Sequence, residues 1–139
     1  GIVISRHYNN DILNNMPQTL KSLKIWSYKF NQNIDNLPQT LKSLEIHGEI
    51  FDKLLNNLPS NLISLQIMCH HYNKPINNLP QTLRMLRIDG HQFNQLLNKL
   101  PKKLKILDIF SKGFNKPTNR LPKTLVLFAL NGKNILYKN

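Results

Sequence analysis

The sequence predicts a mainly β repeat solenoid with one parallel β-sheet, and three observations support this fold class. First, proline recurs every 21 residues without insertion or deletion, at Pro17, Pro38, Pro59, Pro80, Pro101 and Pro122. A fixed period of this length is typical of stacked repeats. Second, apolar residues recur at the same offsets from each proline and form a repeated apolar frame. Third, apolar and polar residues alternate in part of that frame, as they do in a β-strand. Residues 1–139 are therefore predicted to form a single repeat domain of about six 21-residue units, with partial first and last units.

The strand of each unit is expected shortly after its proline. In Leu23-Lys24-Ile25 and Leu44-Glu45-Ile46, apolar residues alternate with charged ones, which turns the aliphatic side chains to one face. An aromatic column completes the apolar frame, at Phe30, Phe51, Tyr72, Phe93 and Phe114. One such unit cannot bury its own apolar face, so the units must stack, with parallel strands ~4.8 Å apart.

The segments between strands are expected to form a convex side of extended chain and turns, with few or no helices. Each proline removes a backbone donor and biases the preceding residue towards extended geometry, and Pro75 and Pro117 add two more breakers. Two columns of asparagine fall where the chain must turn, and we expect their side chains to satisfy backbone groups from coil to coil. These columns are Asn14, Asn56, Asn77, Asn98 and Asn119, and Asn15, Asn36, Asn57 and Asn78.

The exposed face of the predicted sheet is the candidate binding surface. Its residues vary from unit to unit, whereas the core positions repeat. Aromatic and flexible apolar side chains are favoured at the centres of protein interfaces. We therefore predict that a protein partner binds Trp26, His47, Met68, Met85, Ile106, Phe110 and Leu127. Packing beneath a C-terminal cap is an alternative for Met85, Ile106 and Leu127.

The charge of the chain suggests a second function. The net charge is +12, and one repeat position carries a broken ridge of cations at Lys21, Lys42, Arg84 and Lys105. A basic solenoid could bind nucleic acid or another polyanion through this ridge and through the basic C-terminal coils, whose cations include Lys99, Lys102, Arg120 and Lys123. No RNA-binding signature or regular row of stacking aromatic residues accompanies the charge, so protein binding is the leading prediction.

Other charged residues are expected to pair with one another. Lys24 lies beside Glu45 on the neighbouring predicted strand, and Arg87 lies beside Asp108, which predicts cross-strand ion pairs. These pairs take up the charges that could otherwise suggest acid–base chemistry. We therefore predict a protein that is not an enzyme and has no catalytic residues or cofactor.

One column has the composition of a metal site. Glu49, His70 and His91 share a repeat position on three successive coils, and two histidines with a carboxylate can bind iron or zinc. That column spans about 9.6 Å at ~4.8 Å per coil, so all three could meet one ion only by leaning inward. The prediction is therefore no metal site, and Cys69 has no second cysteine with which to form an internal disulfide.

The sequence also bears on location and assembly. It contains no apolar run of eighteen residues and no charged-then-apolar leader, which predicts an intracellular, cytoplasmic protein that does not contact a membrane. Neither terminus shows an evident polar cap, and exposed parallel edges favour self-association by stacking.

The repeat motif resembles a known family. Leu-Pro-Gln-Thr-Leu-Lys-Ser-Leu-x-Ile, followed by a motif such as Phe30-Asn31-Gln32-Asn33-Ile34 or Tyr72-Asn73-Lys74-Pro75-Ile76, is similar to the FNIP repeat, a leucine-rich-repeat relative of amoebae and giant viruses. The resemblance implies a right-handed leucine-rich-repeat-like coil. It also implies a role as the target-recognition part of an F-box-type ubiquitin-ligase adaptor, in the host cell if the protein is viral. No F-box precedes the repeats in this sequence.

Overall fold

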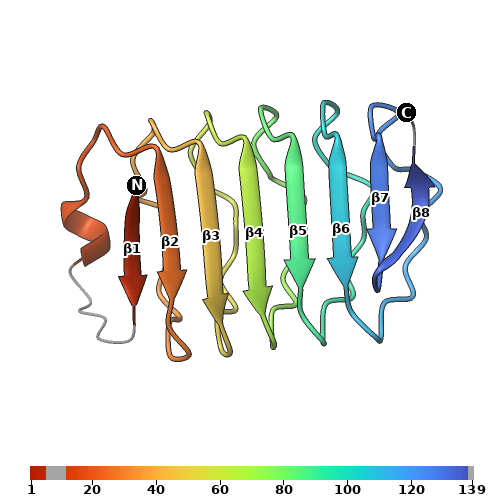
Figure 1. Cartoon of the computed structure of the whole chain (residues 1–139), viewed down its shortest axis with the longest axis horizontal. Helices are drawn as coiled ribbons and strands as arrows, with labels where there is room; N and C mark the ends of the chain where they lie inside the picture. The colour runs from red at the N-terminus through yellow and green to blue at the C-terminus, as the bar shows by residue number, and fades with distance from the viewer. Residues whose placement is uncertain (6–11, 138–139) are drawn as a thin grey trace.

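The computed structural model describes residues 1–5 and 12–137 of the chain. Eight strands form one sheet in which sequence order is also spatial order (Figure 1). The first seven strands are parallel and the last is antiparallel to its neighbour. The strands are β1 (Ile2–Ser5), β2 (Ser22–Trp26), β3 (Ser43–Gly48), β4 (Ser64–Cys69), β5 (Met85–Asp89), β6 (Ile106–Phe110), β7 (Leu127–Leu130) and β8 (Lys133–Tyr137). The predicted β-solenoid is confirmed.

The register of the sheet follows the sequence repeat. Leu23 pairs with Leu44, and Leu44 pairs with Leu65, so each residue lies beside its equivalent in the next coil. Burial alternates along β5, where Leu86 and Ile88 are buried and the residues between and beside them are partly exposed. A slip of one residue would turn every aliphatic side chain to the solvent, which is why the repeat specifies the register so strongly.

The core is a continuous cluster that runs along the solenoid axis from Ile4 to Phe128. Its aromatic column stacks from coil to coil, with ring centroids 5.5 Å apart for Phe30 and Phe51 and 6.2 Å apart for Tyr72 and Phe93. The rings are nearly parallel because each coil repeats the backbone of the last. Neighbouring coils therefore bury one another's apolar side chains, as the nearest-neighbour energetics of repeat proteins require.

The connecting segments are extended chain and turns, as expected. A tight turn opens at each proline, where the carbonyl oxygen of Pro38 accepts the backbone N–H of Leu41 at 3.0 Å, and the same bond recurs in the other coils. In the described part of the chain the one helical element is a 3-10 turn, η1 (Ile12–Asn15). No helix there is long and apolar enough to cross a membrane.

A column of small residues lies at the ends of the strands, at Ser27, Gly48, Cys69, Gly90 and Ser111. The chain bends sharply here, and a Cβ atom on Gly48 would lie 2.7 Å from the carbonyl oxygen of Ser27. The thiol of Cys69 fits in the column by donating to the carbonyl oxygen of Ile46 at 3.5 Å. Burial raises the pKa of Cys69 to about 12, so the thiol stays protonated.

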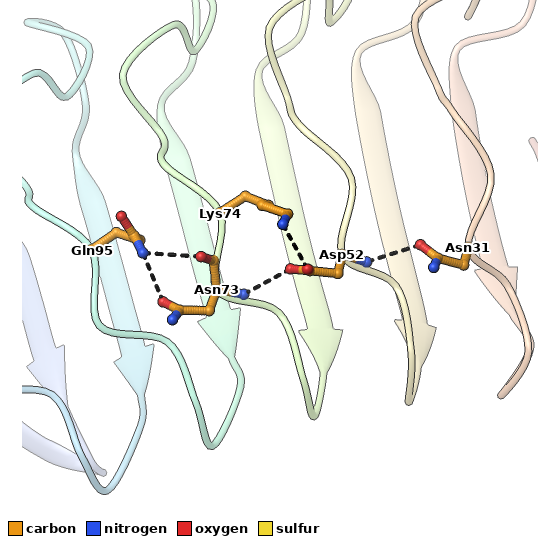
Figure 2. A network of polar contacts seen from close by, with 5 residues as sticks. All are labelled: Asn31, Asp52, Asn73, Lys74 and Gln95. Atoms are coloured by element: carbon orange, nitrogen blue, oxygen red, sulfur yellow. Dashed lines mark hydrogen bonds and ion pairs between the residues drawn. The ribbon is translucent and has the colours of Figure 1, made fainter.

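A polar ladder crosses the convex side (Figure 2). The side-chain oxygen of Asn31 accepts the backbone N–H of Asp52 at 3.1 Å, and Asp52 accepts that of Asn73 at 3.2 Å. The same bond continues through Asn94 to Asn115. This ladder lies one residue after the aromatic column, a position for which the sequence analysis predicted no coil-to-coil bonds. In the asparagine columns before each Leu-Pro, the amide of Asn78 donates to Asn56 at 2.9 Å.

The C-terminal end differs from the open edge that the sequence analysis predicted. Asn131 and Gly132 have φ angles of 52° and 77° and form a two-residue turn that returns the chain as β8. Positive φ at both positions is the geometry of a type I′ hairpin, for which Asn-Gly is the preferred sequence. β8 pairs with β7, so the parallel strand edge at this end is covered. Asn131 therefore lies in a turn and not on the strand face.

Candidate protein-interaction surface

The outward side of the parallel strands carries the residues that the sequence singled out. They point away from the core because they alternate with buried leucine and isoleucine, as in β2, where Leu23 and Ile25 are buried. Trp26 has 52% of its surface exposed and Ile106 has 39%. Trp26 and Phe110 lie on strands four steps apart, about 19 Å at ~4.8 Å per step. The seven predicted partner-binding residues therefore do not form a single cluster.

The first group surrounds a hollow at the end of β2 to β4. Trp26, His47 and Met68 line it together with Ser5, Ser27, Tyr28 and Gly48, and its volume is about 560 Å³. The rings of Trp26 and His47 lie 4.8 Å apart between centroids, tilted by 46°. The hollow forms where the column of small residues leaves space beside two aromatic side chains. An exposed indole at the wall of a hollow is a typical anchor for a protein partner.

A charged network lies beside this hollow and fixes the imidazole of His47. Glu45 accepts a contact from Lys24 Nζ at 2.7 Å and another from His47 Nε2. Burial of Glu45 by itself raises its pKa, but the hydrogen bonds with Lys24 and His47 outweigh that effect and hold the pKa below its usual range. Glu45 therefore remains a carboxylate and orients the ring that packs against Trp26.

The second group is an apolar patch on the last parallel strands. Met85, Ile106 and Leu127 are paired in register on β5, β6 and β7. The sulfur of Met85 also accepts a hydrogen bond from the hydroxyl of Ser64 at 3.7 Å. β8 pairs with β7 and adds a strand to the sheet beside Leu127. It does not cover the outward face of β6, where Ile106 remains exposed.

Phe110 lies at the end of β6, next to Asp89 in the sheet. Its ring meets that of His91 edge to face, with centroids 6.4 Å apart. Asp89 separates Phe110 from Met68 along the same outward column. Phe110 therefore lies apart from the hollow that contains Trp26.

The sequence analysis missed Tyr28. Its side chain is 73% exposed and lines the hollow beside Trp26. Tyr28 shares its repeat position with Glu49, His70 and His91, and an aromatic residue in a column of charged and histidine residues was the available signal.

The cation ridge is present but interrupted. Backbone hydrogen bonds link its positions from coil to coil. The N–H of Lys42 donates to the carbonyl oxygen of Lys21 at 2.8 Å, and the N–H of Lys105 donates to the carbonyl oxygen of Arg84 at 2.8 Å. The apolar residues Ile63 and Val126 occupy two of these positions. Arg84 turns back onto its own coil, where Nη1 donates to the carbonyl oxygen of Thr82 at 2.7 Å. That guanidinium is thus partly used by the protein itself.

Both predicted ion pairs are confirmed. Lys24 and Glu45 lie in contact, and Arg87 Nε lies 3.5 Å from Asp108 Oδ2. Lys24 and Arg87 are each more than 40% exposed, at 44% and 42%. At such exposure an ion pair contributes at most about 1 kcal/mol to stability.

The column of Glu49, His70 and His91 does not converge on one point. The rings of His70 and His91 stack with centroids 4.1 Å apart. Across residues 1–5 and 12–137, no group of three or more histidine, cysteine or acidic side chains is arranged to hold a metal ion. Stacked rings on successive coils are what a repeating backbone produces without any ligand.

The parallel sheet, the stacked core and the extended convex side define a leucine-rich-repeat-like β-solenoid. Residues 8–49 match the family model described as FNIP repeat, so the resemblance inferred from the repeat motif is confirmed for those residues. The crystal structure of CroV588, a circular leucine-rich-repeat protein of a giant virus, is similar, with a TM-score of 0.62 and 27% identity over 92% of this chain. This chain spans 22% of the length of CroV588. No curated protein sequence matches it.

Proposed function

We propose that the chain is a protein-binding module that holds its partner on the strand face. FNIP-repeat and leucine-rich-repeat solenoids are scaffolds typical of protein-interaction modules, and they are typically not catalytic. The observation that carries the proposal is Trp26, an indole 52% exposed at a hollow on the face where the repeats differ from one another. A large aromatic anchor beside a hollow is where interface energy concentrates.

The chemistry of the surface defines the kind of partner. The Trp26 hollow offers aromatic and sulfur surface from Trp26, Tyr28 and Met68, with the imidazole of His47 held by Glu45. The patch of Met85, Ile106 and Leu127 adds aliphatic surface further along the sheet. A protein that places apolar side chains on both areas would cover several strands. The affinity for such a partner should depend little on salt concentration, because the anchoring side chains are uncharged.

The narrower form of the proposal concerns the role of that partner. We propose that the chain is the target-recognition part of an F-box-type ubiquitin-ligase adaptor in the cytoplasm, and the similarity to FNIP repeats supports this role. In that role the strand face selects the protein to be modified. The F-box that such an adaptor needs is not among residues 1–139.

The test is retention of a partner by the purified chain from nuclease-treated cell extract at two salt concentrations. Trp26→Ala/Phe110→Ala removes the two aromatic anchors, and Leu54→Ala/Leu96→Ala is the matched control, since both leucines are about half exposed, at 49% and 50%, and lie off the strands. We expect a protein that is retained at high salt, lost with the first variant and kept by the second. Equal loss with both variants would refute the proposal.

Nucleic-acid binding through Lys21, Lys42, Arg84 and Lys105 gives a different result in the same assay. A complex led by phosphate contacts weakens steeply with salt. Nucleic acid retained at low salt from extract that has not been treated with nuclease, by wild type and by Trp26→Ala/Phe110→Ala alike, would favour that alternative. Ubiquitin-dependent turnover of the retained protein in cells tests the adaptor role.

A further inference from the structure

A basic hollow lies away from the Trp26 hollow, on three successive coils in the C-terminal half. Its volume is about 600 Å³, and four cations line it: Lys99, Lys102, Arg120 and Lys123. Asn77, Gln81, Asn98 and Thr124 add polar groups, and Leu100 and Pro122 complete the lining. No acidic side chain is among these residues. Its residues come from the three segments that precede β5, β6 and β7, whereas Trp26 ends β2.

The four cations replace neutral side chains at two repeat positions. The position of Lys99 and Arg120 holds asparagine in the earlier coils, at Asn36, Asn57 and Asn78. The position of Lys102 and Lys123 holds glutamine or serine, at Gln18, Gln39, Ser60 and Gln81. The fold therefore does not require a cation at either position. Two adjacent coils acquire four positive charges in a two-by-two array.

The surrounding backbone is well held. The side chain of Gln81 accepts the backbone N–H of Lys102 at 3.3 Å. The hydroxyl of Thr124 donates to the carbonyl oxygens of Lys102 and Leu104 at 2.8 and 2.7 Å. The array is therefore built on ordered turns and not on a free terminus.

The charges of the array are not compensated within the described protein. None of the four cations is within ion-pair distance of a described acidic side chain, and Asp108, the acidic residue nearest to them in sequence, pairs with Arg87. Like charges held close together repel, and an anion relieves that repulsion. An arginine also offers a planar fork that matches a phosphate oxygen pair.

We propose that this hollow binds a compact small anion with more than one phosphate group, of the pyrophosphate class. Four positive charges with neighbouring amides match several phosphate oxygens, and the volume is within the range of roughly 300 to 1,000 Å³ common for small-ligand sites. The array ends after two coils and no aromatic side chain lines the hollow, so it lacks the extended track and stacking platform of a nucleic-acid groove. This site is independent of the proposed strand-face function.

The test is calorimetric titration of the whole chain with pyrophosphate and tripolyphosphate at low salt. The site variant is Lys99→Asn/Lys102→Gln/Arg120→Asn/Lys123→Gln, which installs residues that the same positions carry in earlier coils. Lys21→Gln/Lys29→Gln/Lys42→Gln/Lys53→Gln is the matched control, because it removes the same charge elsewhere. We expect the site variant to lose at least ~10-fold in affinity for tripolyphosphate and the control variant to lose less than ~3-fold.

Three results would overturn the proposal: an equal loss in both variants, no binding by wild type, or tighter binding of a single-stranded 20-mer than of tripolyphosphate. Amide chemical-shift changes on wild type should centre on Thr124 and Gln81, and changes elsewhere would contradict the assignment even if the site variant failed to fold. Trp26→Ala/Phe110→Ala should bind the anion as wild type does. Failure of the strand-face proposal therefore leaves this result unaffected.

Discussion

The side-chain oxygen of Asn94 accepts the backbone N–H of Asn115 at 3.1 Å, one full coil further along the solenoid. Asn94 itself is bonded in the same way, because its N–H donates to the side chain of Asn73 at 2.9 Å. The three inner members of the ladder, Asp52, Asn73 and Asn94, are thus each both donor and acceptor. The convex side, which has no strands in these coils, obtains regular coil-to-coil bonds from side chains.

The ladder predicts that stability depends on a side-chain acceptor oxygen at position 94 and not on the charge of that side chain. Asn94→Ala leaves the N–H of Asn115 without its partner and should lower the free energy of unfolding by about 1 kcal/mol. Asn94→Asp keeps an acceptor oxygen, as Asp52 does in the same column, and should remain close to wild type. Urea denaturation of both variants measures the difference. Equal destabilisation by the two substitutions would show that the hydrogen bond is not the cause.

Substitution by alanine should have different effects at Gly48, which lies in the column of small residues, and at Gly113, which lies outside it. Gly48→Ala places a Cβ atom 2.7 Å from the backbone oxygen of Ser27, which cannot move without shifting the coil, so a loss of about 1 to 3 kcal/mol is expected. Gly113→Ala meets nothing within 4 Å and should be neutral or stabilise by up to ~1 kcal/mol. Thermal unfolding compares the two. A neutral Gly48→Ala would mean that the bend after the strands is not tightly packed.

The aromatic column predicts that one hydroxyl is dispensable. Tyr72 is fully buried and its hydroxyl has no hydrogen-bond partner among the described residues, whereas Phe occupies the same position in the neighbouring coils. Burial raises the pKa of Tyr72, as does the nearby charge of Asp52, so the phenol stays neutral. Tyr72→Phe should leave stability unchanged or raise it by up to ~1 kcal/mol.

Phe93→Ala is the contrast for that substitution, because it removes a whole ring from the stack and should cost about 3 to 5 kcal/mol. Chemical denaturation of both variants provides the comparison. A clear loss of stability in Tyr72→Phe would mean that the hydroxyl has a partner after all.

The repeat makes most of the fold predictable from the sequence. A 21-residue period without gaps determines which residues are neighbours, so strand register, core columns and the Lys24–Glu45 pair follow from the spacing alone. The end of the period is harder to see. Asn131-Gly132 is a strong hairpin signal, but the residues that precede it still fit the frame, so the periodicity predicts a further repeat there.

The candidate surface is predictable only in part. Periodicity shows which side chains face outward, and Trp26 and Ile106 are exposed as expected. It does not show where a surface is hollowed, since that depends on the size of neighbouring residues, such as the small Gly48, and on the side-chain direction of residues such as Tyr28. The basic hollow was missed for the same reason. The sequence predicts a basic C-terminal region that suits an acidic partner, and the two-by-two placement of these cations is visible only once equivalent repeat positions are compared.

The final prediction concerns the pH dependence of the network beside Trp26. Glu45 has a folded-state pKa below its unfolded value of roughly 4.3, so its ionised form stabilises the fold above that value, and this contribution is lost as the pH falls through the folded pKa. Glu45→Gln removes the charge and suits the column, where Gln66 is the next residue. It should lower the free energy of unfolding by about 1 kcal/mol at neutral pH. Denaturation at pH 5 and at pH 3 should show the gap between variant and wild type closing at the lower pH. A gap that persists unchanged in acid would mean that Glu45 stabilises the fold through packing and not through its charge.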